Sequence, residues 1–265
     1  MRDWILFDSE LFENHLATSW LGRSFYFFEE LPSTNSYAKQ LNGEGTQHGA
    51  LVLTDDQTGG RGQYDRVWKA ESGKNLTFSL VFEPQKAERF TLLTLACALA
   101  VSETVYSCAD AEARLKWPND VLCKGKKLCG ILTETQFSGN KLERVVIGIG
   151  LNVNQNRFEG ELSDKATSLK KECGKEFVRE KLLADILQRI EYHYRLWNQF
   201  NADLVKQINK ALIGFGEWTR LKVNDEQLDG EFKFLGVNES GSLIALNKDF
   251  DIRTFSHEQV RVQAT

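Results

Sequence analysis

The sequence has few features of a membrane-spanning, secreted or nucleic-acid-binding protein. Its longest strongly apolar stretch, residues 92–101, is far shorter than the roughly 20 residues that an α-helix needs to cross a bilayer. Residues 1–20 contain several acidic side chains and no long apolar run, which matches neither a secretory signal nor an arginine-rich transit peptide. The formal net charge of −4 provides no basic field that would attract nucleic acid. We therefore expect a cytoplasmic protein without DNA or membrane partners.

The cysteines are few, odd in number and irregularly spaced. No two of the five have the two-residue gap of zinc and redox motifs: Cys97, Cys108, Cys123, Cys129 and Cys173. Cys97 and Cys108 lie in apolar surroundings, where a free cysteine behaves as a small hydrophobic residue. We interpret all five as reduced structural thiols in a reducing compartment.

The chain is long enough for one large and one small domain. It has 265 residues, of which 42% are hydrophobic and 26% charged, so a core can form without disulfides. Only three prolines interrupt it. Short apolar runs predict strands at residues 25–28, 50–54, 76–82, 113–116, 126–136 and 144–153. Helices are predicted after an N-cap at Ser33, over the apolar residues 90–105, and at 177–200, where apolar residues keep helical spacing.

The pattern changes after about residue 214. Short runs at residues 219–223, 230–237, 243–246 and 252–255 alternate with polar turns, which is typical of a small antiparallel β-barrel. We therefore predict an α+β domain over residues 1–213 and a β domain over residues 214–265.

The first candidate for chemistry is a glycine-rich loop over residues 57–66, followed by Trp68. Its glycines allow the backbone to approach a ligand closely, and Arg61 and Arg66 add fixed positive charge suited to phosphate or carboxylate. The loop is neither a Walker A nor a Rossmann motif. The alternative is a flexible surface turn with two solvated arginines, but the preceding buried strand and Trp68 favour a ligand-binding loop.

The second candidate is Lys116-Trp-Pro-Asn-Asp120, followed by Lys126-Lys-Leu-Cys-Gly130. Proline restricts itself and the residue before it, so we expect a rigid extended bend. Asp120 could hold a divalent metal or a ligand hydroxyl, or it could form a plain turn with Asn119. Lys127 could end a strand beside a pocket, although lysines at strand ends are usually solvated.

The third candidate is the segment Gly148-Ile-Gly-Leu-Asn-Val153. Two glycines in an otherwise β-branched strand indicate the close approach of another backbone or of a ligand. Asn152, a polar residue at the end of a buried strand, needs hydrogen-bond partners, which could all be internal.

Taken together and in this order, these segments resemble the biotin–protein ligase family. Ser33-Thr-Asn35 matches its Ser-Thr-Asn element, and residues 57–68 resemble its Gly-Arg-Gly loop ending in Arg-x-Trp. Residues 116–120 and 127–130 match its Lys-Trp-Pro-Asn-Asp and lysine-to-glycine steps, and residues 148–153 resemble its Gly-Ile-Gly-Ile-Asn-Val strand. The resemblance covers about residues 25–155. It implies a mixed-sheet catalytic domain of the biotin/lipoate ligase type with a small C-terminal SH3-like β-barrel.

The resemblance also implies a role for each matched residue. Lys127 and Arg61 would be the catalytic cations at the biotin carboxylate and the α-phosphate, and Ser33, Thr34 and Gln57 would bond the ureido end of biotin. The implied biotin site comprises Ser33, Thr34, Asn35, Gln57, Gly60, Arg61, Gly62, Gln63, Lys127 and Gly130. The implied ATP site comprises Arg66, Trp68 on the adenine side, Lys116, Asn119, Asp120 and Asn152, with Asp120 also a ligand of Mg²⁺.

The implied reaction activates biotin with ATP to biotinyl-5′-AMP and passes biotin to a lysine of a biotin carboxyl carrier protein domain. The protein would act as a monomer or homodimer. The nearest alternative is a lipoate–protein ligase or transferase, and a non-catalytic biotin sensor is an alternative of another class. Retention of Arg61 and Lys127 argues against the sensor, because binding biotin alone needs no phosphate site.

Two residues depart from the family pattern. Gln63 stands where many relatives carry a second arginine, and Asp65 stands where glycine is common. A neutral Gln63 removes one cation from the loop, so we expect the adenylate to be retained less tightly. Only about 24 residues, which include several acidic side chains, precede the first predicted strand, too few for the helix-turn-helix of repressor members. We therefore expect the short form, without a DNA-binding domain.

Overall fold

The computed structural model describes residues 5–41, 47–63, 66–84, 89–139, 141–223, 226–256 and 260–262, so Asp65 lies outside the described residues. A seven-stranded mixed sheet dominates it, in the order β1-β2-β3-β7-β6-β5-β4. β1 runs parallel to β2, and the other neighbouring strands are antiparallel. The strands are β1 (Phe25–Leu31), β2 (Leu51–Gln57), β3 (Leu76–Phe82), β4 (Ala113–Lys116), β5 (Asp120–Cys123), β6 (Lys126–Ser138) and β7 (Lys141–Leu151).

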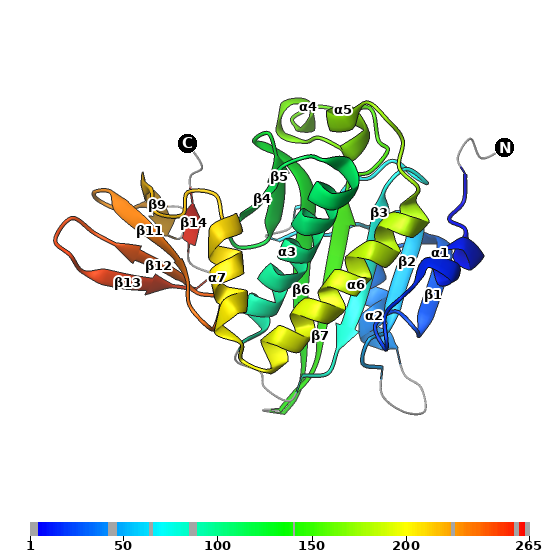
Figure 1. Ribbon diagram of the computed structural model, residues 1–265, viewed down its shortest axis with the longest axis horizontal. Coiled ribbons are helices and arrows are strands. Elements are labelled where there is room, and N and C mark those ends of the chain that lie inside the picture. The colour runs from blue at the N-terminus through cyan, green and yellow to red at the C-terminus, as the bar shows by residue number, and fades with distance from the viewer. Residues whose placement is uncertain are drawn as a thin grey trace.

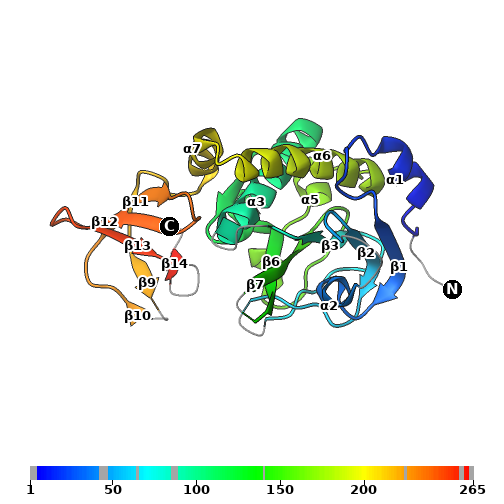
Figure 2. The ribbon, with the colours of Figure 1, turned by 90° about the horizontal axis from the view of Figure 1, so that it is seen from below.

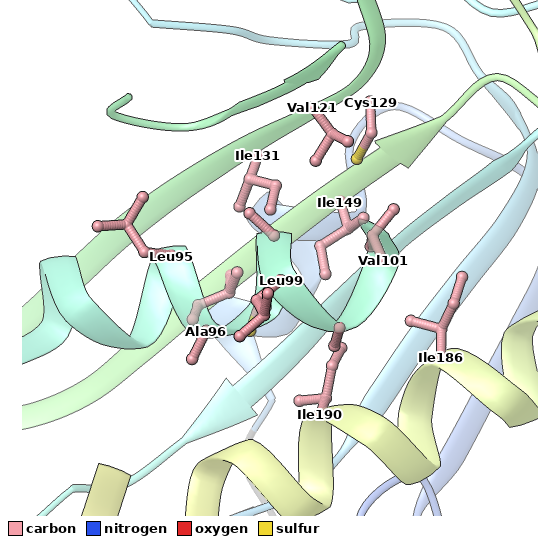
Figure 3. Close-up of a cluster of buried hydrophobic side chains, with 14 of the residues drawn as sticks. Leu95, Ala96, Leu99, Val101, Val121, Cys129, Ile131, Ile149, Ile186 and Ile190 are labelled. Carbon is pink, nitrogen blue, oxygen red and sulfur yellow. The ribbon is translucent and has the colours of Figure 1, made fainter. Parts of the chain in front are cut away.

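Helices cover the two faces of this sheet unequally. The long helices α3 (Phe90–Ala109) and α6 (Arg179–Asn198) lie on one face, and the short α2 (Thr34–Gln40) lies on the other (Figures 1 and 2). Side chains of α3 and α6 meet those of the central strands in the core (Figure 3). Only α3 among the described helices is long and apolar enough to cross a membrane, and 78% of its apolar window is buried in the protein. The second face of the sheet is therefore left open beside α2.

Most predicted elements are confirmed, with different ends. The strand predicted at residues 25–28 continues to Leu31, and α3 continues to Ala109. All residues of β3 are buried, because both faces of the sheet are covered there. The prediction missed β5, α1 (Ser9–His15), α4 (Leu162–Lys165), α5 (Leu169–Cys173) and α7 (Ala202–Ala211).

The C-terminal strands form two small antiparallel sheets at one end of the molecule (Figure 1). One contains β10, β9 and β14, and the other contains β13, β12, β11 and β8. Their bounds are β8 (Trp218–Thr219), β9 (Leu221–Val223), β10 (Glu226–Gln227), β11 (Phe232–Val237), β12 (Leu243–Leu246), β13 (Ile252–Phe255) and β14 (Val260–Val262). The antiparallel strands are confirmed, whereas closure into a barrel stays a prediction.

The C-terminal strands pack on the main sheet domain through the turn between β11 and β12. The indole N–H of Trp117 donates to the carbonyl of Gly241 at 3.1 Å, and the Arg89 guanidinium donates to the carbonyl of Glu239 at 2.9 Å. The buried side chains of β11 and β12 belong to the same hydrophobic cluster as those of α3. The segment carrying Trp117 is therefore buttressed from the C-terminal side.

Candidate active site

The first wall of the site is the N-terminus of α2. Ser33 caps the helix as predicted, because its hydroxyl accepts from the backbone N–H of Ser36 at 3.3 Å. The cap presents Thr34 and Asn35 to the sheet, where both are buried. The Ser79 hydroxyl on β3 lies within hydrogen-bond distance of both side chains, 2.7 Å from the Thr34 hydroxyl and 2.6 Å from Asn35 Oδ1. The Ser-Thr-Asn element is thus fixed on the open face of the sheet.

The glycine-rich loop forms the second wall. Gln57 ends β2, and its side-chain oxygen accepts from the backbone N–H of Thr34 at 3.0 Å, which joins the loop to α2. The loop then folds back on itself, with Gly62 N–H donating to the carbonyl of Arg66 at 2.7 Å. A Cβ on Gly60 would lie 2.3 Å from the carbonyl oxygen of Trp68, so only glycine fits where the two ends of the loop meet.

Trp68 is laid across the sheet by this loop, over glycines of two paired strands. Gly130 on β6 pairs with Gly150 on β7, and a Cβ on Gly150 would lie 2.3 Å from Trp68 Cε2. On Gly148, a Cβ would lie 2.2 Å from Asn35 Oδ1. The expectation that these glycines admit another backbone or a ligand is therefore corrected, because in this structure they admit two site side chains.

Arg61 does not point freely into solvent but meets a carboxylate on β6. Its Nη2 lies 2.9 Å from Glu134 Oε2, and Lys39 Nζ lies 2.8 Å from Glu134 Oε1. The amide of Asn35 also donates to Glu134, at 2.9 Å. Burial opposes ionisation of Glu134, but the hydrogen bonds from Lys39 and Asn35 and the charge of Arg61 outweigh it, and the pKa is lowered. Glu134 is therefore an ionised partner of three groups.

Lys127 lies at the other end of the site. Its Nζ lies 2.6 Å from Asp120 Oδ1, and the side chain is 36% exposed. Lys127 is the second residue of β6 and lies beside a bulge against β5, and its backbone carbonyl accepts from Thr167 N–H at 2.9 Å. The chain turns between β4 and β5, with a cis Trp117–Pro118 bond, so the predicted extended bend is wrong. In that turn Asn119 bonds the backbone, through its amide to the carbonyl of Ile131 at 2.7 Å.

Asn152 has one free oxygen. Its amide donates to the carbonyl of Thr167 at 3.0 Å, whereas its buried Oδ1 has no hydrogen-bond partner among the described residues. The indole N–H of Trp68 is buried and unpartnered in the same sense. Buried polar groups are seldom left unpaired, so these two atoms are suited to ligand contacts.

The sequence reasoning missed one wall, formed by residues 158–166. This segment connects β7 to the later helices and contributes Phe158, Leu162, Asp164, Lys165 and Ala166 to the site. The apolar residues of this segment do not recur at a spacing that would indicate a helix or a strand. The available signal was the pair Phe158 and Leu162, which are apolar in an otherwise polar stretch after Asn152.

These walls enclose one cavity of about 510 Å³ on the open face of the sheet. All of the predicted site residues except Gly60 line it. Cations outnumber carboxylates in the lining, which includes Arg61, Arg66, Lys69, Lys116, Lys127 and Lys165 against Asp120 and Asp164. Among the residues that the structure describes, no three His, Cys, Asp or Glu side chains cluster to hold a metal. The excess of cations therefore suits the cavity to an anionic ligand.

The mixed sheet, the capped Ser-Thr-Asn helix and the cationic glycine-rich loop around one cavity are typical of an enzyme that binds anionic substrates. Comparison with known proteins identifies the family. The profile of the Biotin/lipoate A/B protein ligase family matches residues 27–152. The bifunctional ligase/repressor BirA of Bacillus subtilis is 35% identical over 235 residues, which are 86% of this chain and 71% of that protein. The chain belongs to this family, among its biotin–protein ligases.

Two further relatives agree with this placement. The biotin–[acetyl-CoA-carboxylase] ligase of Mycobacterium tuberculosis is 32% identical over 182 residues, covering 66% of this chain and 65% of that protein. The biotin protein ligase of Aquifex aeolicus, solved in complex with biotin and ATP, superposes with a TM-score of 0.79 at 28% identity. That match covers 92% of this chain and 100% of the other.

Proposed function

We propose that this protein joins biotin to a lysine of a biotin carboxyl carrier protein domain, using ATP. The observation that carries this proposal is the meeting of all four motif segments in one cation-rich cavity. Two anions must come together for the first step, and the cavity lining supplies more cations than carboxylates to meet them. Glu134 and Asp120 pair with Arg61 and Lys127 in this structure, so these two cations must turn from their partners towards the substrates. A pocket that only sensed biotin would not need that surplus of cations.

In the first step, a biotin carboxylate oxygen attacks the α-phosphorus of ATP while the bond to the pyrophosphate oxygen breaks. Ser33, Thr34 and Gln57 would hold the ureido ring at the α2 end of the cavity. Lys127 would leave Asp120 to neutralise the carboxylate and the α-phosphate as charge builds up there. The free oxygen of Asn152 and the indole N–H of Trp68 would contact the nucleotide.

In the second step, the acceptor amine attacks the acyl carbon of biotinyl-5′-AMP, loses a proton and expels AMP. Lys127 would remain beside the leaving phosphate. The glycine-rich loop and residues 158–166 would cover the mixed anhydride and keep water from hydrolysing it. The acceptor lysine must then enter from the open side of the cavity.

Magnesium would bind together with the nucleotide, not at a site formed by protein ligands alone. Mg²⁺ is commonly held by one or two carboxylates together with substrate phosphates, and Asp120 is a carboxylate of this kind in the cavity. Bound there, the ion would neutralise phosphate charge.

The proposal also includes the division of the chain into domains and the cellular compartment of the enzyme. We place the catalytic domain in residues 1–213 and an SH3-like barrel in residues 214–265, supported by the seven short strands after residue 217. We place the enzyme in the cytoplasm, and all five cysteines are free thiols in this structure, as a reducing compartment requires.

Biotin-dependent exchange of labelled pyrophosphate into ATP tests the proposal. We expect exchange with biotin and none with lipoate, because the exchange requires reversible formation of the acyl adenylate. Exchange with lipoate alone would move the protein to the lipoate ligases. No exchange with either acid from folded protein would favour a biotin sensor.

The substitution Gln63→Arg is expected to slow release of biotinyl-5′-AMP. Gln63 lines the cavity beside Arg61, and an arginine there would add a charged hydrogen bond to the adenylate. Such bonds contribute about 1.5–3 kcal/mol, of which an exposed loop would realise a fraction. Release of labelled adenylate from preloaded wild-type and variant protein measures the effect, and equal rates would contradict it. Gln63→Asn serves as a neutral control.

A further inference from the structure

Glu134 has no place in the mechanism above, yet it is the carboxylate that joins the two walls of the biotin end. We propose that Glu134 is a positioning residue that ties the glycine-rich loop to α2 and so determines how firmly biotin is held. This inference rests on the proposed placement of biotin between α2 and the loop. Glu134 is not itself among the residues that line the cavity.

The contacts of Glu134 come from both walls. Asn35 and Lys39 belong to α2, and Arg61 belongs to the loop. Arg61 Nη2 also donates to the Ser36 hydroxyl at 3.1 Å, so its guanidinium bridges β6 and α2. Only 20% of the Glu134 side chain is exposed. Solvent and salt therefore screen these interactions less than they would at an open surface.

The loop has few other attachments to α2. Gln57 holds its beginning through Thr34, and the backbone N–H groups of Thr58 and Gly59 donate to the carbonyls of Leu31 and Pro32, just before the helix, at 3.1 and 2.8 Å. The bonds from Gly62 to Arg66 and from Trp68 to Gly60 shape the loop internally but do not join it to the helix. Three glycines also leave its backbone flexible. The position of the loop tip relative to α2 therefore depends on Arg61, which is held by its carboxylate partner Glu134 and by the Ser36 hydroxyl.

Loss of the tie should weaken biotin binding without changing the nucleotide end. Asn35 would lose one of its acceptors, and Arg61 would gain rotamer freedom that biotin binding must then remove. Lys127, Asp120 and Asn152 lie on other segments and keep their contacts. A role confined to stability would instead affect both substrates together.

A double-mutant cycle on the full chain tests this inference. We expect Glu134→Gln to raise the biotin Kd, measured by calorimetry without ATP, by about tenfold, and to change the Kd of ATP by less than twofold. In an Arg61→Met background the same substitution should change the biotin Kd by less than twofold, because the partner is already gone. Lys39→Met, which removes the other cation from Glu134, should leave the biotin Kd within twofold of wild type.

Hydrogen exchange of the loop amides gives a second readout that needs no ligand. Glu134→Gln should speed exchange at the Gly62 amide, which is hydrogen-bonded inside the loop, and leave α6 amides unchanged. Additive effects in the cycle, or unchanged loop exchange, would overturn the inference. If wild-type protein fails to bind biotin while Glu134→Gln still speeds loop exchange, the proposed function fails and the tie stands.

Discussion

Lys127→Ala is expected to lower biotin-dependent pyrophosphate exchange at least a hundredfold. Lys127 lines the cavity, where its Nζ lies 2.6 Å from Asp120 Oδ1 and 6.0 Å from the centroid of the Trp68 ring. Removal of a charge-stabilising group of this kind commonly costs a factor of about 10²–10³ in rate, or roughly 2.7–4 kcal/mol. Initial exchange rates at saturating biotin and ATP measure the loss.

The neighbouring Lys126 provides a matched control for this prediction. It starts the same strand and carries the same charge, but it does not line the cavity. Lys126→Ala should therefore leave exchange within about twofold of wild type. A Lys127→Ala protein with exchange within threefold of wild type, and an unchanged Tm, would show that Lys127 does not stabilise the adenylation transition state.

The fold was predictable where apolar periodicity is strong, and less so where tertiary contacts decide. The strands at residues 76–82 and 113–116 were predicted at the observed bounds, and α6 to within two residues at each end. β5 was missed because its three apolar residues are consecutive and all buried, so they show no alternation, and the chain pairs the strand with β6 through a bulge. α7 was missed because it is only ten residues long, although Leu204, Val205 and Ile208 keep helical spacing on the face that packs against the core.

The site residues also divide into those that the sequence pattern predicts and those that only tertiary contacts reveal. Arg61, Lys127 and Asn152 were predicted because motif residues carry a recognisable order, and the structure brings them to one cavity. Glu134 lay outside every motif, and nothing in its local sequence says that it faces Arg61, 73 residues away. The two glycines of β7 were noticed, but only coordinates reveal that Trp68 and Asn35 fill the space above them. Long-range pairing of side chains is what the sequence alone leaves open.

Alanine at Gly150 and alanine at Gly148 are expected to impair opposite ends of the site. A Cβ at Gly150 would overlap the Trp68 indole at 2.3 Å, and a Cβ at Gly148 would overlap the Asn35 amide at 2.2 Å. Both contacts are too short for any packing, so the facing side chain must move. We therefore expect Gly150→Ala to raise the KM for ATP about tenfold or more, and Gly148→Ala to raise the KM for biotin by a similar factor.

The two glycines are matched controls for one another, since they lie two residues apart on the same face of β7. Pyrophosphate exchange at varied biotin and at varied ATP gives both KM values for each variant. The Gly150 effect acts through the indole, so Trp68→Leu should by itself raise the KM for ATP, and adding Gly150→Ala to it should change that KM by less than twofold, because the overlap is already gone. If both variants raised both KM values equally, the strand would simply be distorted, and the assignment of Trp68 to the nucleotide end and of α2 to the biotin end would lose its support.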